Sequence, residues 1–178
     1  ACIAGGILIV YVNMGARAEY LLTASLMAAP AALVISKINY NPDTVSGNNL
    51  EFIELTNNGN ASVNLTGIYF RQLGMTYSFP SGSTIAANQK IFLAEDTARF
   101  REFYGFKAFD LFHHELSDNS FDLLLSTGYG DIIDRVIYSD SAPWPVGADG
   151  TGAYLKLTNL NADNSLASNW VASTECFY

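Results

Sequence analysis

The chain has two histidines, and they are adjacent in His113-His114-Glu115. A metal-binding or general-base role requires a partner group within reach, such as a second cluster of His or Cys. The sequence contains no such cluster, and the spacing matches no zinc motif. The pattern therefore predicts a solvated loop after Phe112 and no metal centre there.

Three side chains with oxygen ligands alternate near the end of the sequence, at Asn159, Asn161 and Asp163. This spacing is similar to that of a calcium loop, which takes its ligands from alternating positions. The glycine at the sixth loop position is missing, and Leu166 is not the bidentate acid that the loop needs. Two alternatives stay open, a weak calcium site and turns held by local Asx hydrogen bonds.

The remaining polar motifs do not form a catalytic set. The stretch Asp149-Gly150-Thr151-Gly152 suits a turn or an ion or phosphate site, and no Gly-x-Ser-x-Gly elbow occurs. Asp131 and Asp134 stand three apart in a strand pattern, which places them on opposite faces and disfavours an acid/base pair. The sequence therefore predicts no catalytic residue and no cofactor.

Trp144 lies between two prolines, and a second tryptophan, Trp170, lies near the end of the sequence. Both are expected to pack in the core or at its edge, because a large aromatic ring gains most from burial. If Trp144 is instead exposed, its loop becomes the best candidate for a ligand contact.

Short strand patterns separated by turn signals recur about every ten residues after residue 32. In residues 51–56, Phe52, Glu54 and Thr56 alternate with Ile53 and Leu55, so the two sets face opposite sides. One two-turn helix is expected at Thr97–Tyr104, between a capping Asp96 and Gly105. The other expected strands are 33–40, 63–70 with Gly67 as a bulge, 76–79, 90–94, 121–126, 132–138 and 153–157. This pattern predicts an all-β, antiparallel sandwich.

Charge is distributed unevenly along the 178 residues. Residues 1–37 contain only Arg17, Glu19 and Lys37 of the 9 basic and 17 acidic side chains, which leaves 7 basic and 16 acidic ones and a net charge of −9 beyond residue 37. Binding to the phosphate backbone of a nucleic acid requires clustered Lys and Arg. An acidic composition therefore disfavours nucleic acid as a partner.

The first 32 residues predict an apolar helical segment. Two apolar runs, 1–12 and 20–35, are separated by a polar break, and each is shorter than the ~20 residues that cross a bilayer comfortably. Membrane contact through residues 1–35 is one interpretation. A signal peptide, which lacks a convincing basic flank, and a buried soluble helix are the alternatives.

Residues 14–37, from Met14-Gly15-Ala16-Arg17-Ala18-Glu19 through Ala28-Ala29-Pro30-Ala31-Ala32 to Lys37, resemble concentrative nucleoside transporters, as does Ile3-Ala4-Gly5-Gly6. The resemblance covers about residues 1–37. The hairpins and helices that carry the transport sites of that family are missing from the sequence, so no substrate-binding residue is carried over and we expect no transport.

A second resemblance covers about residues 33–172. The segments Glu51-Phe52-Ile53-Glu54-Leu55, residues 63–70, Tyr77-Ser78-Phe79-Pro80, residues 131–138 and Pro143-Trp144-Pro145 together are similar to a lamin-tail domain of the bacterial type. The resemblance implies an immunoglobulin-like sandwich that serves as an accessory interaction module on secreted or surface proteins, without catalytic residues.

The sequence as a whole predicts two parts, a transporter-like segment at 1–32 and a lamin-tail-like domain at 33–175. We expect residues 33–40 to be the first strand of the sandwich rather than the end of a helix. The expected function is a non-catalytic interaction module, extracellular or at the cell surface, with a membrane tether as one option and a protein or surface polymer as partner. The alternatives are a fragment of a nucleoside transporter and a composite reading frame without an integrated function.

Overall fold

The computed structural model describes residues 33–42, 50–71 and 76–177. Residues 31–178 are assigned to one compact unit, separate from residues 1–30. The apolar helical segment expected at 1–32 lies outside the described residues, and so do its membrane and signal-peptide interpretations. In the part of the chain that is described, no helix is long and apolar enough to cross a membrane.

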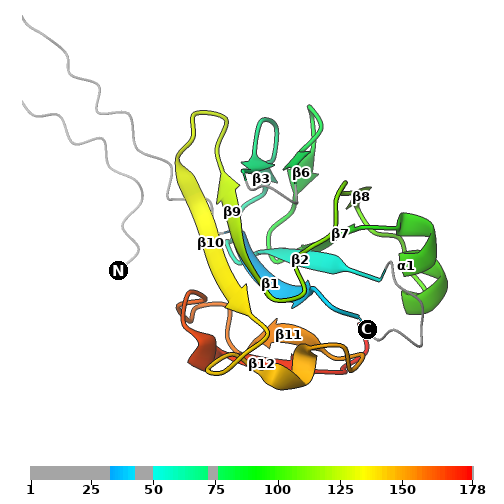
Figure 1. Cartoon of the computed structure of the whole chain (residues 1–178). Coiled ribbons are helices and arrows are strands. Elements are labelled where there is room, and N and C mark those ends of the chain that lie inside the picture. Colours follow the sequence, from blue (N-terminus) through cyan, green and yellow to red (C-terminus); the bar gives the residue numbers. More distant parts are fainter. Residues whose placement is uncertain (1–32, 43–49, 72–75, 178) are drawn as a thin grey trace, which may run out of the picture. The chain divides into compact units, whose positions relative to one another are not determined.

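A six-stranded sheet forms one layer of the fold (Figure 1), in the strand order β12-β11-β1-β2-β7-β8. Its strands are β1 (Leu33–Asn39), β2 (Phe52–Asn57), β7 (Lys90–Ala94), β8 (Asp110–Leu111), β11 (Tyr154–Leu157) and β12 (Trp170–Ser173). Neighbours are antiparallel except β7 and β8, which run parallel. The expectation of a purely antiparallel sandwich is wrong at this edge. A helix between the two strands supplies the long connection that parallel pairing requires.

A four-stranded antiparallel sheet forms the second layer, in the order β10-β9-β4-β5. Its strands are β4 (Tyr69–Phe70), β5 (Tyr77–Ser78), β9 (Ser120–Ser126) and β10 (Ile132–Ser139). A separate pair joins β3 (Val63–Asn64) to β6 (Thr84–Ile85). Two short 3-10 helices, η2 (Val146–Ala148) and η3 (Ala167–Asn169), complete the described fold.

The single strand expected at 63–70 is wrong, because it is two strands, β3 and β4, in different sheets. The chain turns between them, where the Ile68 N–H donates to the Leu65 carbonyl at 3.0 Å. Gly67 has a φ of +77° in this turn and is not a bulge. Glycine suits that conformation because it has no Cβ to clash.

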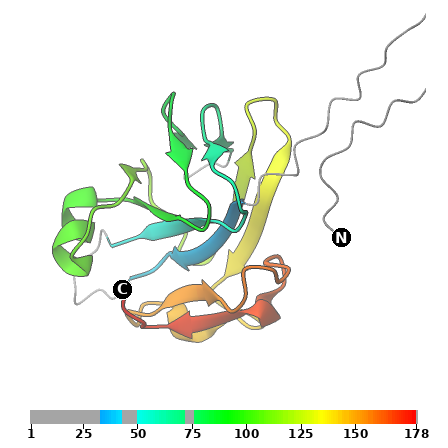
Figure 2. The same ribbon diagram turned by 180° about the vertical axis from the view of Figure 1, so that it is seen from behind.

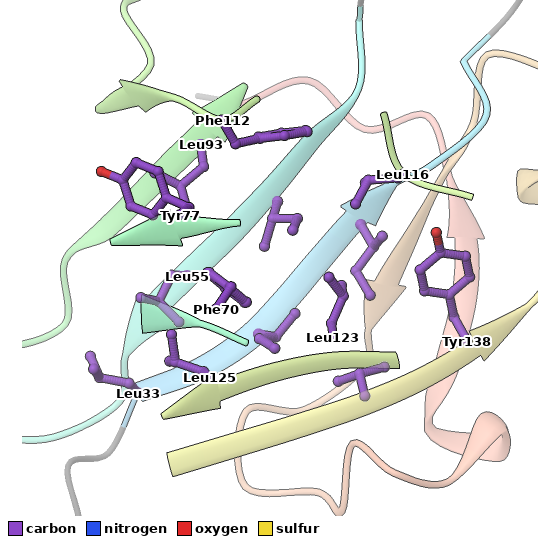
Figure 3. Packing of buried hydrophobic residues seen from close by; sticks show 14 of the residues in the cluster. Leu33, Leu55, Phe70, Tyr77, Leu93, Phe112, Leu116, Leu123, Leu125 and Tyr138 are labelled. Atoms are coloured by element: carbon purple, nitrogen blue, oxygen red, sulfur yellow. The ribbon is translucent and has the colours of Figure 1, made fainter. Parts of the chain in front are cut away.

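The main core lies between the two layers (Figure 3). Leu55 and Leu93 point inward from the six-stranded sheet, and Phe70, Leu123 and Leu125 meet them from the four-stranded sheet. The expected alternation in β2 is confirmed, since Ile53 and Leu55 belong to this core whereas Phe52 belongs to a second cluster on the other face. Burial of these apolar faces drives the two layers together.

Helix α1 (Thr97–Tyr104) has the bounds and caps that the sequence predicts. The Asp96 carboxylate accepts hydrogen bonds from the N–H groups of Ala98 and Arg99, both at 2.9 Å, and Gly105 ends the helix with a φ of 82°. Phe100 anchors the helix on the outer face of the six-stranded sheet. In Figures 1 and 2 the helix and the long β9–β10 hairpin lie at opposite sides of the sandwich.

Residues 33–39 form a strand, as expected, and it lies in the middle of the six-stranded sheet. A regular alternation would place Val34, Ser36 and Ile38 on one face and Ile35 and Lys37 on the other, and this expectation is wrong. Pairing with β2 shifts between Ile35 and Lys37, which marks a bulge at Ser36. As a result Ile35 and Ile38 both face the main core, and Ser36 and Lys37 both reach Glu54 on the outer face.

Candidate functional site

A buried ion pair lies on the outer face of the six-stranded sheet. Lys37 and Glu54 face each other across β1 and β2, and Lys37 Nζ donates to Glu54 Oε2 at 2.6 Å. Lys37 is 8% exposed and Glu54 1%. Ser36 Oγ donates to Glu54 Oε1 at 2.8 Å and lies 2.7 Å from the Thr56 hydroxyl. The bulge in β1 creates this site because it turns two consecutive polar side chains to one face.

Burial dominates the electrostatics of the pair. Removal from water disfavours the charged ammonium and lowers the pKa of Lys37, and the hydrogen bond that Lys37 donates to Glu54 opposes that shift. A second cation, Lys90, has its Nζ 4.0 Å from Glu54 Oε1 but is half exposed. The carboxylate therefore has one short ionic partner, Lys37, and one hydroxyl donor, Ser36, whose own oxygen contacts the Thr56 hydroxyl.

Aromatic rings surround the lysine ammonium. Lys37 Nζ lies 4.4 Å from the centroid of the Phe177 ring, 5.6 Å from that of Phe92 and 5.7 Å from that of Tyr154. These distances are within the range of cation–π attraction. The rings belong to a cluster that β2, β7, β11 and α1 hold in place, made up of Phe52, Phe92, Phe100, Tyr104, Phe106, Tyr154 and Phe177. We call the six rings other than Phe177 the aromatic groove, and the Phe177 ring packs against five of them.

The segment 174–177 crosses the aromatic groove after β12 ends at Ser173. The Tyr154 hydroxyl donates to the backbone carbonyl of Glu175 at 2.8 Å. The Glu175 carboxylate pairs with Lys156, and this hydrogen bond lowers its pKa. Phe177 then places its ring over Lys37. The segment thus covers the ion pair without joining the sheet.

A second buried acid, Glu51, lies near the opposite layer. It is 6% exposed, and its carboxylate accepts the Leu116 N–H at 2.6 Å. Burial raises its pKa to about 8, because desolvation outweighs that hydrogen bond and the nearby carboxylates of Glu95, Glu115 and Asp118 add repulsion. Among the described residues, no group of three or more His, Cys, Asp or Glu side chains could hold a metal ion.

Two tyrosines stack at the same end of the sandwich. The rings of Tyr40 and Tyr138 are 4.7 Å apart, and the Tyr138 hydroxyl donates to the Ser117 carbonyl at 2.8 Å. The Tyr40 hydroxyl is buried without a hydrogen-bond partner in the described part of the chain. Burial and the carboxylates of Asp149, Asp140 and Asp118 raise the pKa of Tyr40 to about 12, so it stays neutral.

Asp134 holds the two layers together at the bulge. Its Oδ2 accepts the Ile35 N–H at 2.6 Å and the Asn164 side-chain amide at 2.8 Å. Asp131, by contrast, lies in the β9–β10 turn, where it accepts a hydrogen bond from Thr127. Burial raises the pKa of Asp134, although three donors oppose the shift. The two aspartates make separate contacts, and Asp134 has a structural one.

The calcium candidates make hydrogen bonds within the protein. Asn159 Oδ1 accepts the Asn161 N–H at 2.9 Å, and Asp163 Oδ1 accepts the Ser165 N–H at 3.0 Å. These two are the Asx turns of the second alternative. Asn161 Oδ1 instead accepts the side-chain amide of Asn58, which is distant in the sequence, at 2.9 Å. The carboxylate of Asp163 also accepts the Ser165 hydroxyl, which lowers its pKa.

Trp144 is buried, with 8% of its surface exposed, and its ring centroid lies 5.8 Å from that of Trp170. The condition for a ligand contact at its loop is therefore not met, and the ring packs in the core. His113 and His114 are both exposed, on the loop between Phe112 and Leu116. Asp149 accepts a hydrogen bond from the Asn41 amide at 2.7 Å and holds its turn against the end of β1.

Sequence reasoning missed the Lys37–Glu54 pair and the aromatic groove. One signal was present, since a Lys and a Glu are the only charged residues in two neighbouring strands. Charged residues are rarely buried unless they are paired, so two such positions in adjacent strands indicate a partner relationship. The contribution of Phe177, however, has no local pattern in the sequence.

Comparison with known proteins gives two matches. Residues 27–164 match the family described as Lamin Tail Domain. Solute carrier family 28 member 3 of Eptatretus stoutii is 38% identical over 94 residues, which cover 53% of this chain and 13% of that protein. The chain thus spans about an eighth of that protein's length. Both resemblances seen in the sequence are confirmed. Because the family match extends over most of the chain, the protein belongs to the lamin tail domain family.

Proposed function

We propose that this protein is a non-catalytic, immunoglobulin-like interaction module that acts outside the cell or at its surface. The observation that carries the proposal is the closed state of its most reactive pair. Glu54 and Lys37 are bonded to each other and lie beneath aromatic rings, rather than at the base of an open cleft.

The other buried acids also have structural bonds. Glu51 accepts a backbone N–H in the loop before β9, and Asp134 accepts one from β1. A general acid or base must come within hydrogen-bond reach of a substrate proton. A carboxylate that is engaged in the interior cannot do so without opening the fold. These contacts support a role in stability rather than in catalysis.

Exposed apolar side chains support a binding role. Tyr129 in the β9–β10 turn is 98% exposed, Ile132 at the start of β10 is 59% exposed, and Phe103 on α1 is 56% exposed. Aromatic and large apolar residues are enriched in protein interfaces. Their partner is proposed as a protein or a surface polymer. The extracellular location rests on the resemblance to bacterial lamin-tail domains.

Two measurements test the proposal. The purified chain is incubated with model peptide, ester, glycoside and phosphate substrates, beside a Glu54→Gln variant as control. We expect no turnover above background for either protein. Turnover that the substitution abolishes would overturn the non-catalytic role. Protease treatment of intact cells that produce the tagged chain tests the location, and we expect loss of the tag; full protection would contradict an extracellular position.

A further inference from the structure

The segment 174–177 is held by contacts that resemble those of a bound peptide. It forms no strand with its neighbours, and it follows β12 over the outer face of the sheet. Its anchors come from three sources, namely the Lys156 side chain, the Tyr154 hydroxyl and the rings of the aromatic groove. Each anchor recognises a different chemical group of the segment.

The three contacts together define a recognition pattern. Lys156 donates a hydrogen bond to the carboxylate of Glu175, and the Tyr154 hydroxyl donates one to the backbone carbonyl of the same residue. Two residues further on, the Phe177 ring enters the groove, with centroids 4.8 Å from Tyr104, 5.0 Å from Phe92 and 5.2 Å from Tyr154. An extended peptide with an acid two positions before an aromatic residue meets all three contacts.

We propose that the aromatic groove is a docking site for an extended peptide of the form acid-x-aromatic, which the segment 174–177 occupies in cis. The inference rests on the proposed interaction function and names the surface and the partner chemistry for it. A partner segment with the same pattern exchanges with residues 174–177.

The contacts favour exchange for two reasons. The Lys156–Glu175 pair is exposed, with 31% and 67% of the two side chains accessible, so water and salt weaken it. The rings that Phe177 contacts belong to other elements, since Phe52 lies on β2 and packs on Phe100 of α1, with ring centroids 5.9 Å apart.

The selectivity for an aromatic residue follows from the ion pair beneath it. Phe177 lies closest to the Lys37 ammonium, 4.4 Å from ring centroid to Nζ. An occupant without a ring leaves that cation without its nearest π face. A peptide with an aliphatic residue at this position is thus expected to bind more weakly than one with Phe, Tyr or Trp.

The test is a fluorescence polarisation titration with the full chain. The probe is a labelled peptide with the sequence of residues 172–177, with Ser in place of Cys176. A short tether gives the cis segment an effective concentration on the order of millimolar, which masks the groove in the unaltered chain. A Phe177→Ala variant weakens the cis occupant, so we expect it to bind the peptide at least about tenfold more tightly than the unaltered chain.

One control variant and two altered peptides measure the separate contributions of the peptide's aromatic ring and of its acid. Ile137→Ala truncates an exposed apolar side chain on the other sheet and should leave peptide binding unchanged. Peptides in which the acid becomes Gln or the Phe becomes Ala should bind Phe177→Ala more weakly than the parent peptide does. Equal binding of the Phe-to-Ala peptide would overturn the inference.

A charge swap keeps the test valid if Phe177→Ala folds poorly. In a Lys156→Glu chain, Glu175 loses its partner, and a peptide with Lys in place of the acid should bind better than the parent peptide. A folded Lys156→Glu chain that prefers neither peptide, or that binds none at about 1 mM, would overturn the docking site. That result leaves the non-catalytic role standing, because turnover and surface display are measured separately.

Discussion

At the scale of single residues, the most consequential pair is Lys37 and Glu54. A buried ion pair loses hydration, and its geometry must offset that loss. Here a 2.6 Å contact, a hydrogen bond from the Ser36 hydroxyl and three aromatic rings provide the compensation. Removal of one partner leaves the other buried and unpaired.

Glu54→Gln should therefore lower the free energy of unfolding by about 3–5 kcal/mol, as measured by urea denaturation. The double variant Glu54→Gln with Lys37→Met should recover much of the loss, because no lone charge stays buried. Arg135→Ala, which breaks the exposed Arg135–Asp122 pair, is the control and should have little effect. A single variant as stable as the control would show that the pair is not buried in solution.

The titration of Glu51 is expected to make the folded state less stable as pH rises. Its pKa is about 8 in the folded chain against an ordinary value of 4.5, so the folded state holds a proton that the unfolded state releases. The contribution of Glu51 to stability is fully present below about pH 4.5 and is lost as pH rises to about 8. The slope is at most about 1.4 kcal/mol per pH unit.

Glu51→Gln should remove this decline, because Gln keeps an oxygen for the Leu116 N–H and carries no charge. Urea midpoints at pH 5 and pH 8 measure the difference. We expect the substitution to stabilise the protein at pH 8 and to have a smaller effect at pH 5. Parallel pH curves for the two proteins would contradict a raised pKa at Glu51.

At the scale of elements, the bulge in β1 is the feature that shapes both faces of the sheet. It sends Ile35 and Ile38 to the main core and Ser36 and Lys37 to Glu54. At this point the Ile35 N–H donates a hydrogen bond to the carboxylate of Asp134, which belongs to the other layer. Bulges of this kind re-aim side chains at the cost of local pairing.

Asp134→Ala should leave the buried Ile35 N–H without an acceptor and cost about 1–3 kcal/mol of stability. The diagnostic measurement is amide hydrogen exchange, which should accelerate at Ile35 more than at Ile53 on the neighbouring strand. Asp131→Ala, in the exposed β9–β10 turn, is the matched control. Unchanged protection at Ile35 would mean that the bulge does not depend on Asp134.

At the scale of the whole molecule, most sheet edges are short. β5 and β8 have two residues each and β12 has four, which limits unwanted pairing with other chains. β10 is longer, with eight residues, and carries Asp134 and Arg135. Charged side chains on an edge strand reduce aggregation by the same principle. The centre of the large sheet, in contrast, depends on β1, which pairs with both β2 and β11.

This position makes β1 indispensable. A chain that begins at residue 31 should unfold cooperatively and keep the β-type circular dichroism of the full chain, because residues 31–178 form one compact unit. A chain that begins at Tyr40 lacks β1 and should be unfolded. Denaturant curves compare the two, and a folded chain without β1 would show that the sheet can close without its central strand.

Local patterns predicted much of the fold because the signals are short-range. Asp96 and Gly105 bracket α1, and the alternation of Ile53 and Leu55 with Phe52 assigns the faces of β2. The division of residues 63–70 into two strands was not predicted. It depends on Gly67 adopting a positive φ, and apolar residues on both sides of it favour a strand equally well.

The candidate site was less predictable than the fold. Asn159, Asn161 and Asp163 were found by their spacing. The side chains of Asn159 and Asp163 take part in local turns, whereas that of Asn161 bonds to the distant Asn58. Trp144 was assigned to the core and lies there. The ion pair and the groove join β1, β2, β7, β11 and residues 174–177, whose separations in the sequence exceed any spacing rule.

The sequence by itself determined the mostly β fold, its helix, the strand at residues 33–39 and the family, because periodicity, caps and motif order are local properties. Only the tertiary structure decided that Lys37 meets Glu54, that the Phe177 ring lies over Lys37 and that Asp134 accepts the Ile35 N–H. A one-residue bulge reverses the face of every side chain beyond it. The composition of each face is therefore a property of the paired strands rather than of either strand alone.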